Sequence, residues 1–288
     1  MKKIMLHPNP TRDMNLENTR KIAQFLKSRD IEVTIPVDVA VVDYPCFKIL
    51  PFDEAIRDVD MIFSIGGDGS ILHTIAKAVG TGIKILGINS GRMGYMAELE
   101  ADEFDYLEKV LDGNYIVEER MMIDVSIRRG HDIIVSGTGL NDVIVAKTSR
   151  LKIIDIDVYA DRSFISHYQG DGVAIATPTG STAYSMSAGG PIIDPITESI
   201  TITPICTHSL SAKPIVLSSK REISVQALSK VDGAIGVSVD GAEHVPLNYG
   251  DQVIIKRSDY TTKLVRVKNV NFYDILCTKL SDRRFEGN

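Results

Sequence analysis

The segment from Ser64 to Ser70 places one carboxylate, Asp68, among three glycines. Residues 60–65 form a short apolar run typical of a buried strand, and residues 70–79 have the spacing of a helix that ends at Gly80. The glycines therefore lie at a helix N-terminus, where bare N–H groups and the helix dipole favour an anion and no Cβ blocks its approach. This pattern predicts a phosphate held beside a carboxylate base, although a plain strand-to-helix turn capped by Asp68 fits the same residues.

Two common phosphate-binding signatures, G-x-G-x-x-G and G-x-x-x-x-G-K-[ST], are not found at this segment. Phosphate chemistry here must therefore be organised by backbone N–H groups, a metal ion and the carboxylate. No dense group of carboxylates accompanies the motif, so we expect the metal ion to be held mainly by the phosphate-bearing ligand and not by protein ligands.

The composition is that of a globular protein, because 44% of the 288 residues are hydrophobic and 24% are charged. The chain is long enough for two domains, and we expect neither a transmembrane helix nor a signal peptide. A net charge of -6 without a basic block argues against nucleic acid or an anionic membrane as a partner. The three cysteines, Cys46, Cys206 and Cys277, are scattered, which predicts a reducing cytoplasmic location without a zinc site or a disulfide.

The first 120 residues alternate between strand-like and helix-like patterns. Such alternation is typical of a Rossmann-like α/β domain with a mostly parallel sheet, in which ligands bind at the carboxyl ends of the strands. Residues 66–69 and the glycine-rich segment 89–95 both lie at such ends. We expect strands at residues 3–6, 32–37, 60–65 and 83–88, and helices at residues 15–27, 70–79 and 102–111.

Beyond residue 120 the chain consists of short β-type runs broken by glycine, proline and asparagine. Their spacing predicts a mainly antiparallel β-sandwich domain over residues 121–265. The amphipathic segment 272–280 is expected to pack back on the first domain, which then comprises residues 1–120 and 266–288. The β-type runs are residues 123–127, 153–159, 202–205, 223–225 and 235–239.

Two further segments gather groups that can bind a nucleotide. G-D-G at residues 170–172 is followed by T-P-T-G-S-T-A-Y-S at residues 177–185, where small hydroxyl groups lie beside a glycine and an aromatic ring. Hydroxyl and N–H groups can bind ribose, amide or phosphate oxygens. Asn141 and Asp142 add an amide and a carboxylate at the start of an apolar strand. Taken singly, each of these segments also fits ordinary turn or cap chemistry.

In their order along the chain, the three clusters closely resemble the NAD kinase family. The resemblance covers most of the chain and includes the runs at residues 89–95, 187–191, 208–214 and 272–276. Gly-Gly-Asp-Gly alone is also similar to a motif of phosphofructokinases and of lipid kinases of the diacylglycerol type. The T-P-T-G-S-T-A-Y run favours the NAD kinase family over these two other families.

The resemblance implies a kinase that transfers a phosphoryl group from ATP, or from inorganic polyphosphate, to the 2′-hydroxyl of the adenosine ribose of NAD, giving NADP. Asp68 is then the general base that accepts the proton of the ribose hydroxyl. Gly66, Gly67 and Gly69 present N–H groups to the donor phosphates, and Mg²⁺ or another divalent cation bridges the phosphate oxygens.

The resemblance also implies which residues bind NAD. Asp142 suits the ribose hydroxyls and Asn141 suits a ring nitrogen. Asp171 matches an acidic residue near the nicotinamide, which in some members comes from a neighbouring subunit. His73 and Lys152 fit surface positions equally well. The other NAD-binding candidates are Gly69, Tyr95, Gln169, Thr179, Thr182, Ala183, Tyr184 and Ser187.

Several properties stay open at this point. Gln169 stands where some members carry an arginine, so the preference between NAD and NADH is not determined. The sequence also does not determine whether ATP or polyphosphate is the phosphate donor, or whether NADP(H) inhibits the enzyme by feedback. We expect an even-numbered homo-oligomer, a dimer or a tetramer, because a neighbour could complete a pocket at the edge of the β domain.

Two other functions compete with this interpretation. A kinase of another hydroxyl substrate would share the Gly-Gly-Asp-Gly motif, but the polar run at residues 177–187 argues against a lipid substrate. A non-catalytic sensor of NAD(H) or NADP(H) would retain the binding residues without turnover, although Asp68 disfavours this function. Replacing Asp68 with asparagine separates the kinase from the sensor.

Overall fold

The computed structural model describes residues 1–39, 47–91, 94–149, 152–209, 212–231 and 233–282. Cys46 and parts of the motif runs, at residues 92–93 and 210–211, lie outside the described residues. The chain divides into two compact units. The first comprises Met1–Glu119 and Thr262–Asn288, and the second comprises Arg120–Thr261.

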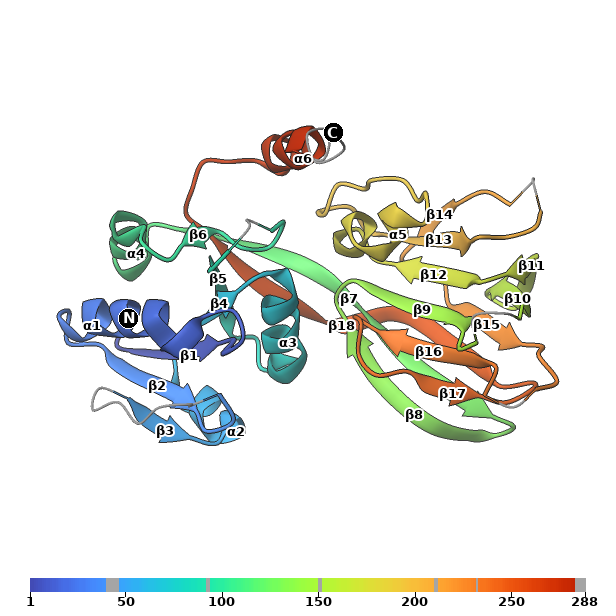
Figure 1. Ribbon diagram of the computed structural model, residues 1–288, viewed down its shortest axis with the longest axis horizontal. Coiled ribbons are helices and arrows are strands. Elements are labelled where there is room, and N and C mark those ends of the chain that lie inside the picture. Colours follow the sequence, from blue (N-terminus) through green and yellow to red (C-terminus); the bar gives the residue numbers. More distant parts are fainter. Residues whose placement is uncertain (40–46, 92–93, 150–151, 210–211, 232, 283–288) are drawn as a thin grey trace. The chain divides into compact units, whose positions relative to one another are not determined.

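The first unit contains a parallel β-sheet with helices packed against it (Figure 1). The strand order is β3-β2-β1-β4-β5, and β6 and the end of β18 both pair with β5. Every one of these pairings is parallel. The strands are β1 (Lys3–Pro8), β2 (Glu32–Pro36), β3 (Lys48–Leu50), β4 (Met61–Gly66), β5 (Lys84–Asn89) and β6 (Leu99–Glu100).

The helices of this unit bury one apolar face against the sheet, as their spacing predicts. In α1 (Glu17–Lys27) the buried apolar residues are Ile22, Ala23 and Leu26, which join strand residues in one core. The other helices are η1 (Met14–Leu16), α2 (Phe52–Ala55), η2 (Ile56–Asp58), α3 (Asp68–Ala78), α4 (Phe104–Leu111) and α6 (Phe272–Asp282). The centroid of the Phe272 ring lies 6.5 Å from that of the Tyr95 ring, so within the first unit α6 contacts the N-terminal part of the chain.

The second unit consists of two antiparallel sheets. One has the order β11-β10-β15-β18, with β18 also pairing with β7 and β7 with β8, and the other has the order β14-β13-β12-β9-β16-β17. Strands β7 and β18 each contribute residues to both units. The first sheet contains β7 (Ile116–Arg129), β8 (Asp132–Gly139), β10 (Ile154–Ala160), β11 (Ser163–Gly170), β15 (Ile223–Ala227) and β18 (Gln252–Arg266). The second contains β9 (Asp142–Lys147), β12 (Gly172–Ala176), β13 (Ser199–Ile205), β14 (Ile215–Ser218), β16 (Ile235–Val239) and β17 (Val245–Leu247).

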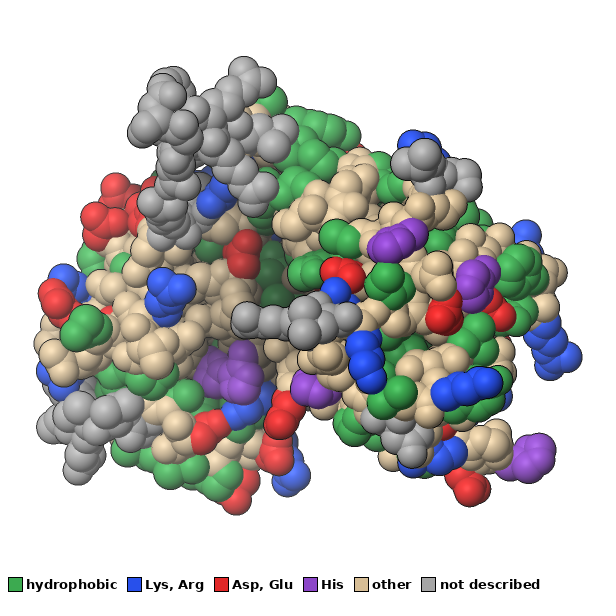
Figure 2. Space-filling model, turned by 45° about the vertical axis from the view of Figure 1, so that its right-hand side comes forward, with side chains coloured by type: hydrophobic (Ala, Val, Ile, Leu, Met, Phe, Trp, Pro, Cys, Tyr) green, Lys and Arg blue, Asp and Glu red, His purple; other side chains and the backbone are tan. Residues whose placement is uncertain are grey.

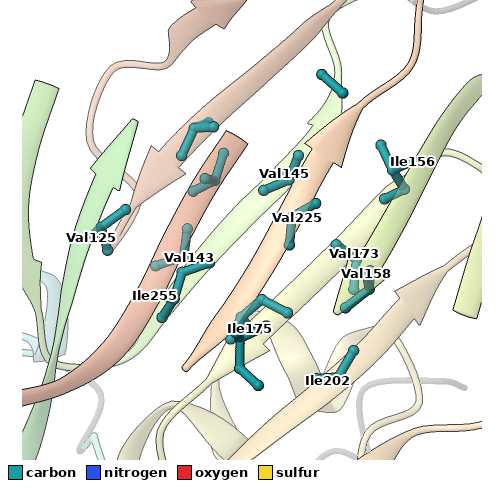
Figure 3. Packing of buried hydrophobic residues seen from close by; sticks show 14 of the residues in the cluster. Val125, Val143, Val145, Ile156, Val158, Val173, Ile175, Ile202, Val225 and Ile255 are labelled. Carbon is teal, nitrogen blue, oxygen red and sulfur yellow. The ribbon is translucent and has the colours of Figure 1, made fainter. Parts of the chain in front are cut away.

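The core of the second unit lies between its two sheets. Inward side chains such as Val158 and Val225 from one sheet and Val145 and Val173 from the other belong to one buried cluster (Figure 3). Two short helices, η3 (Thr179–Thr182) and α5 (Tyr184–Ser187), follow β12. The predicted fold class is therefore confirmed: an α/β unit with a parallel sheet and a second unit with antiparallel sheets packed face to face.

The surface carries charges of both signs. Figure 2 shows acidic and basic side chains interspersed over the face drawn, in keeping with the absence of a basic block in the sequence. Cys206 and Cys277 are free and exposed. Within the described part of the chain, no helix combines the length and the apolar character needed to cross a membrane.

Candidate functional site

Asp68 begins α3 directly after the buried strand β4. At Gly66 a Cβ atom would come closer than 3.0 Å to the side chain of Ser70, so this turn requires glycine. Gly67 is the N-cap residue, and Gly69 is exposed in the first turn, where a Cβ would meet no described atom within 4 Å. The first-turn N–H groups of a helix have no intrahelical partner, so this end can accept an anion.

The Asp68 carboxylate is fixed by backbone N–H groups from a different segment. Tyr95 N–H donates to Oδ2 at 2.8 Å, and Met96 N–H donates to Oδ1 at 3.1 Å. Gly94 makes this approach possible, because a Cβ there would lie well under 3.0 Å from all three carboxyl atoms of Asp68. The carboxylate is thus held in one orientation while it lines a cavity.

This cavity has a volume of about 680 Å³, and we call it the Asp68 cavity. Two cations line it, Arg12 after β1 and Lys279 on α6, and among the described residues neither forms an ion pair. Asn89 also lines it. Its side chain is 1% exposed, and its Oδ1 has no hydrogen-bond partner within the described part of the chain. A cavity of this size with glycine N–H groups, two cations and one carboxylate suits a polyanion. One end of this polyanion would lie next to the Asp68 carboxylate, which can act as a general base.

His73 and Tyr95 lie in the same unit as Asp68. His73 is exposed on α3, and its ring stacks on that of His7 at a centroid distance of 5.7 Å. Tyr95 is half-buried and holds Asp68 through its backbone. Within the described residues, no group of three or more His, Cys, Asp or Glu side chains is placed to hold a metal ion.

Asn141 and Asp142 lie at the start of β9 in the second unit and are both buried. The carboxylate of Asp240 accepts hydrogen bonds from three backbone N–H groups, those of Leu140 at 2.7 Å, Asn141 at 2.7 Å and Asp142 at 3.0 Å. Burial, and then the neighbouring charge of Asp240, raise the pKa of Asp142 to about 7. Burial also raises the pKa of Asp240, against the effect of its three backbone donors.

The helices η3 and α5 pack closely against this pair. A Cβ at Gly180 would come within 3.0 Å of the Asn141 backbone, Thr177 N–H donates to the Asn141 carbonyl at 2.8 Å, and the Tyr184 N–H donates to the Asp142 carboxylate. Asn141 Oδ1 is buried and has no hydrogen-bond partner among the described residues. The structure therefore brings Asn141, Asp142, Thr179, Thr182, Ala183 and Tyr184 into one cluster, with Ser187 at the exposed end of α5.

Three predicted residues of this unit lie elsewhere. Asp171 forms an ion pair with Lys147 at 2.5 Å, beyond the opposite end of the β9–β12 pairing from Asp142, about 17 Å along the strands. Gln169 is exposed on β11 and donates to Asp155 at 3.1 Å. Lys152 is exposed just before β10.

The sequence analysis missed several residues that shape the two sites. Gly94 lies in a segment that was recognised as glycine-rich, but its contact with Asp68 was not predicted. Asp240 precedes Gly241 and resembles an ordinary turn residue, and Arg12 and Lys279 stand far from any motif. Their roles depend on contacts between distant segments, for which the local sequence gives no signal.

Comparison with known proteins gives consistent matches. A family model described as the ATP-NAD kinase N-terminal domain matches residues 48–115, and one described as the ATP-NAD kinase C-terminal domain matches residues 140–267. An NAD kinase of Carboxydothermus hydrogenoformans is 39% identical over 236 residues, covering 82% of this chain and 84% of the relative. One of Natranaerobius thermophilus is 38% identical over 283 residues, covering 98% of both.

Two solved structures have a similar fold. Yeast NADH kinase complexed with NADH superimposes with a TM-score of 0.86 over 95% of this chain and 85% of that one, at 24% identity. An NAD kinase from Archaeoglobus fulgidus in complex with ATP superimposes with a TM-score of 0.76 over 98% of this chain and 99% of that one, at 27% identity.

Proposed function

The chain is an enzyme of the NAD kinase family, and we propose that it transfers the γ-phosphoryl group of ATP to the 2′-hydroxyl of the adenosine ribose of NAD, giving NADP. The observation that carries this proposal is the Asp68 carboxylate, held by two backbone N–H groups inside a cavity that also contains a helix N-terminus and two cations. Phosphoryl transfer to a hydroxyl needs a carboxylate and a polyanion site next to each other.

Asp68 acts as the general base. A ribose hydroxyl is a poor nucleophile at neutral pH, and a carboxylate within hydrogen-bond reach orients it and accepts its proton as the new P–O bond forms. The backbone N–H groups of Tyr95 and Met96 hold each carboxylate oxygen but leave lone pairs on both for the hydroxyl. The base is therefore positioned before the substrate arrives.

The donor phosphates bind at the start of α3. The N–H groups of Gly67 and Gly69 offset their charge together with the side chains of Arg12 and Lys279, all of which line the Asp68 cavity. We also propose a phosphate contact for the N–H group of Gly66, which directly precedes this lining. Mg²⁺ or another divalent cation, carried on the phosphates, supplies further charge neutralisation during transfer. Such a cation suits a cavity whose own anionic group is Asp68 alone among the described lining residues. Inorganic polyphosphate would use the same phosphate contacts.

Arg12→Ala is expected to raise the KM for ATP by about ten- to 150-fold, because a charged hydrogen bond to phosphate contributes roughly 1.5–3 kcal/mol. The KM for NAD should stay unchanged, because Arg12 lines the Asp68 cavity, where we place the phosphates of the donor. Steady-state kinetics with each substrate varied in turn measure both constants. Arg57→Ala, which removes an exposed arginine of the same unit, is the matched control. An equal rise in both KM values would contradict a donor role for Arg12.

The adenosine half of NAD binds the cluster around Asn141. Asn141 Oδ1, which has no partner among the described residues, accepts a hydrogen bond from the adenine amino group, and the Asn141 amide N–H group donates one to a ring nitrogen. The Asp142 carboxylate accepts hydrogen bonds from the ribose hydroxyls. Thr179, Thr182, Ala183, Tyr184 and Ser187 form the wall around the dinucleotide. We also propose NAD contacts for Gly69, Tyr95, Lys152 and Gln169, and a place near the nicotinamide for Asp171. His73, the remaining candidate, lines the smaller cavity described in the next subsection.

NAD affinity is expected to depend on pH through Asp142. Its pKa is about 7, so the carboxylate is ionised and a full acceptor above pH 7 and becomes protonated below it. The Kd for NAD should therefore rise by up to tenfold per pH unit as the pH falls from 7 toward 5. Titration calorimetry across this range, with Asp142→Asn as the variant whose affinity should lack this slope, measures the effect. The same slope in the variant would assign the titration to another group.

A direct assay tests the proposed function. The purified protein is incubated with NAD, Mg²⁺ and either ATP or polyphosphate, and NADP formation is followed with an NADP-specific dehydrogenase. We expect NADP with ATP. No NADP with either donor, together with measurable NAD binding, would refute the kinase and favour a dinucleotide sensor. We further propose a cytoplasmic homo-oligomer, a dimer or a tetramer, whose order size-exclusion chromatography with light scattering measures.

A further inference from the structure

A second, smaller cavity adjoins the Asp68 cavity. Its volume is about 230 Å³, and the two cavities share Asn9, Gly69 and Ser70 in their walls. This side chamber is smaller than the ~300–1,000 Å³ typical of a complete ligand site, so it suits one group of a larger ligand whose remainder occupies the Asp68 cavity. Pro8, Pro10 and Val39 give it apolar walls, and the ring of His73, which stacks on that of His7, also lines it. Such walls are unsuited to phosphate and suited to a flat ring.

His7 supplies a polar group to this chamber. His7 lines it and is 3% exposed, and its ring packs against that of Phe52 in a T-shaped arrangement at a centroid distance of 5.3 Å. Nδ1 lies 2.7 Å from the hydroxyl of Thr74. The other ring nitrogen, Nε2, is buried and has no hydrogen-bond partner among the described residues. A buried polar atom without a partner costs free energy unless a ligand or water satisfies it.

The hydrogen bonds around Thr74 assign the proton on His7. The Thr74 hydroxyl has one proton, which it donates to the Ser70 carbonyl at 3.0 Å. Ser64 Oγ and His7 Nδ1 both lie 2.7 Å from the same hydroxyl oxygen, so each of them must donate to it. In a neutral ring with its proton on Nδ1, Nε2 carries a lone pair and accepts a hydrogen bond. Burial, with smaller contributions from Lys77 and His73, lowers the pKa of His7 to about 4, which keeps the ring neutral.

We propose that the side chamber binds the purine base of the phosphate donor, and that His7 Nε2 accepts a hydrogen bond from the exocyclic amino group of adenine. This inference rests on the proposed function, because it places the donor phosphates in the Asp68 cavity. It makes His7 the residue that selects ATP over a donor whose base has a carbonyl oxygen at that position. It also favours a nucleoside triphosphate over polyphosphate, since polyphosphate has no group for the chamber.

Equilibrium binding to the full-length protein tests this inference. The probes are ATP, ITP, whose base carries a carbonyl oxygen in place of the amino group, and inorganic tripolyphosphate, which has no base. We expect the wild type to bind ATP about tenfold more tightly than ITP, because ITP leaves the buried Nε2 opposite an acceptor. In His7→Phe the ratio should fall to near one, with the affinity for tripolyphosphate unchanged. His131→Phe, at an exposed turn of the other unit, should keep the wild-type ratio.

A second variant protects the test against a folding defect at His7. Val39→Phe fills the chamber without touching the hydrogen bonds of His7, and it should weaken ATP about tenfold while leaving tripolyphosphate unaffected. An unchanged ratio of ATP to ITP in His7→Phe, an unchanged ATP affinity in Val39→Phe, or weaker binding of NAD instead of ATP in either variant would each overturn the inference. Because these are binding measurements, a failure of NADP formation would refute the proposed function separately.

Discussion

Replacing Asp68 with asparagine is expected to lower kcat for NADP formation by about 10²- to 10⁴-fold, the range that a general base contributes. The amide cannot accept the proton of the ribose hydroxyl, yet it has nearly the same shape and retains one oxygen that can accept a backbone N–H group. The fold and the affinity for NAD should therefore persist. Single-turnover kinetics and NAD titration on the same preparation measure the two effects separately.

Asp53→Asn provides a matched control, because it makes the same change at an exposed position on α2 in the same unit and should leave kcat unchanged. If Asp68→Asn kept the wild-type kcat and lost NAD affinity, Asp68 would be a ligand for a hydroxyl group and not a base. That result would leave the kinase activity in place and assign the general base to another group.

The α/β unit could be predicted from the sequence because its elements are specified locally. The run at residues 60–65 supplies four buried apolar residues to β4, with Ser64 as a buried polar residue among them, and the helical spacing after it places Ile71 and Ile75 of α3 in the core. Glycine marks the ends of these elements, where the chain needs conformations that other residues rarely adopt. The local pattern and the tertiary packing therefore agree in this part of the chain.

The longest strand, β18, was not predicted. Residues 256–263 within it are largely polar and charged, a composition that disfavours a buried strand. The strand conformation is imposed by pairing with β15 at one end and with β5 at the other. β8 was missed for a similar reason, since most of its residues are exposed and it pairs with β7 alone in the sheet. Strand propensity depends on neighbours that a single sequence does not show.

The candidate site was predicted only in part for the same physical reason. Asp68 and Asn141 stand out because glycine or a second polar residue accompanies them in the chain. Asp240, which holds the backbone at Asn141 from 99 residues away, looks like any aspartate before a glycine. Residues that position a site often come from distant parts of the chain and can be identified only in the folded structure. Residues that perform the chemistry lie within short motifs that the sequence shows directly.

Gly94→Ala is expected to lower kcat to about the same extent as Asp68→Asn, roughly 10²-fold or more, although Gly94 itself has no chemical group. An added Cβ would overlap the Asp68 carboxylate, which would have to leave the N–H groups of Tyr95 and Met96. Losing two charge-assisted hydrogen bonds should also lower the free energy of unfolding by about 1–3 kcal/mol. NADP formation and chemical denaturation measure the two effects.

Gly91→Ala separates this mechanism from a general need for glycine in the segment. A Cβ at Gly91 would meet no described atom within 4 Å, so that variant should keep kcat within about twofold and unfold like the wild type. Equal losses in both variants would show that the segment requires backbone freedom and not space for Asp68. A loss confined to Gly94→Ala would show that the Asp68 carboxylate needs the space left by the missing Cβ of Gly94. Asp68 must be held in one orientation before the ribose hydroxyl arrives, and an added methyl group would prevent this.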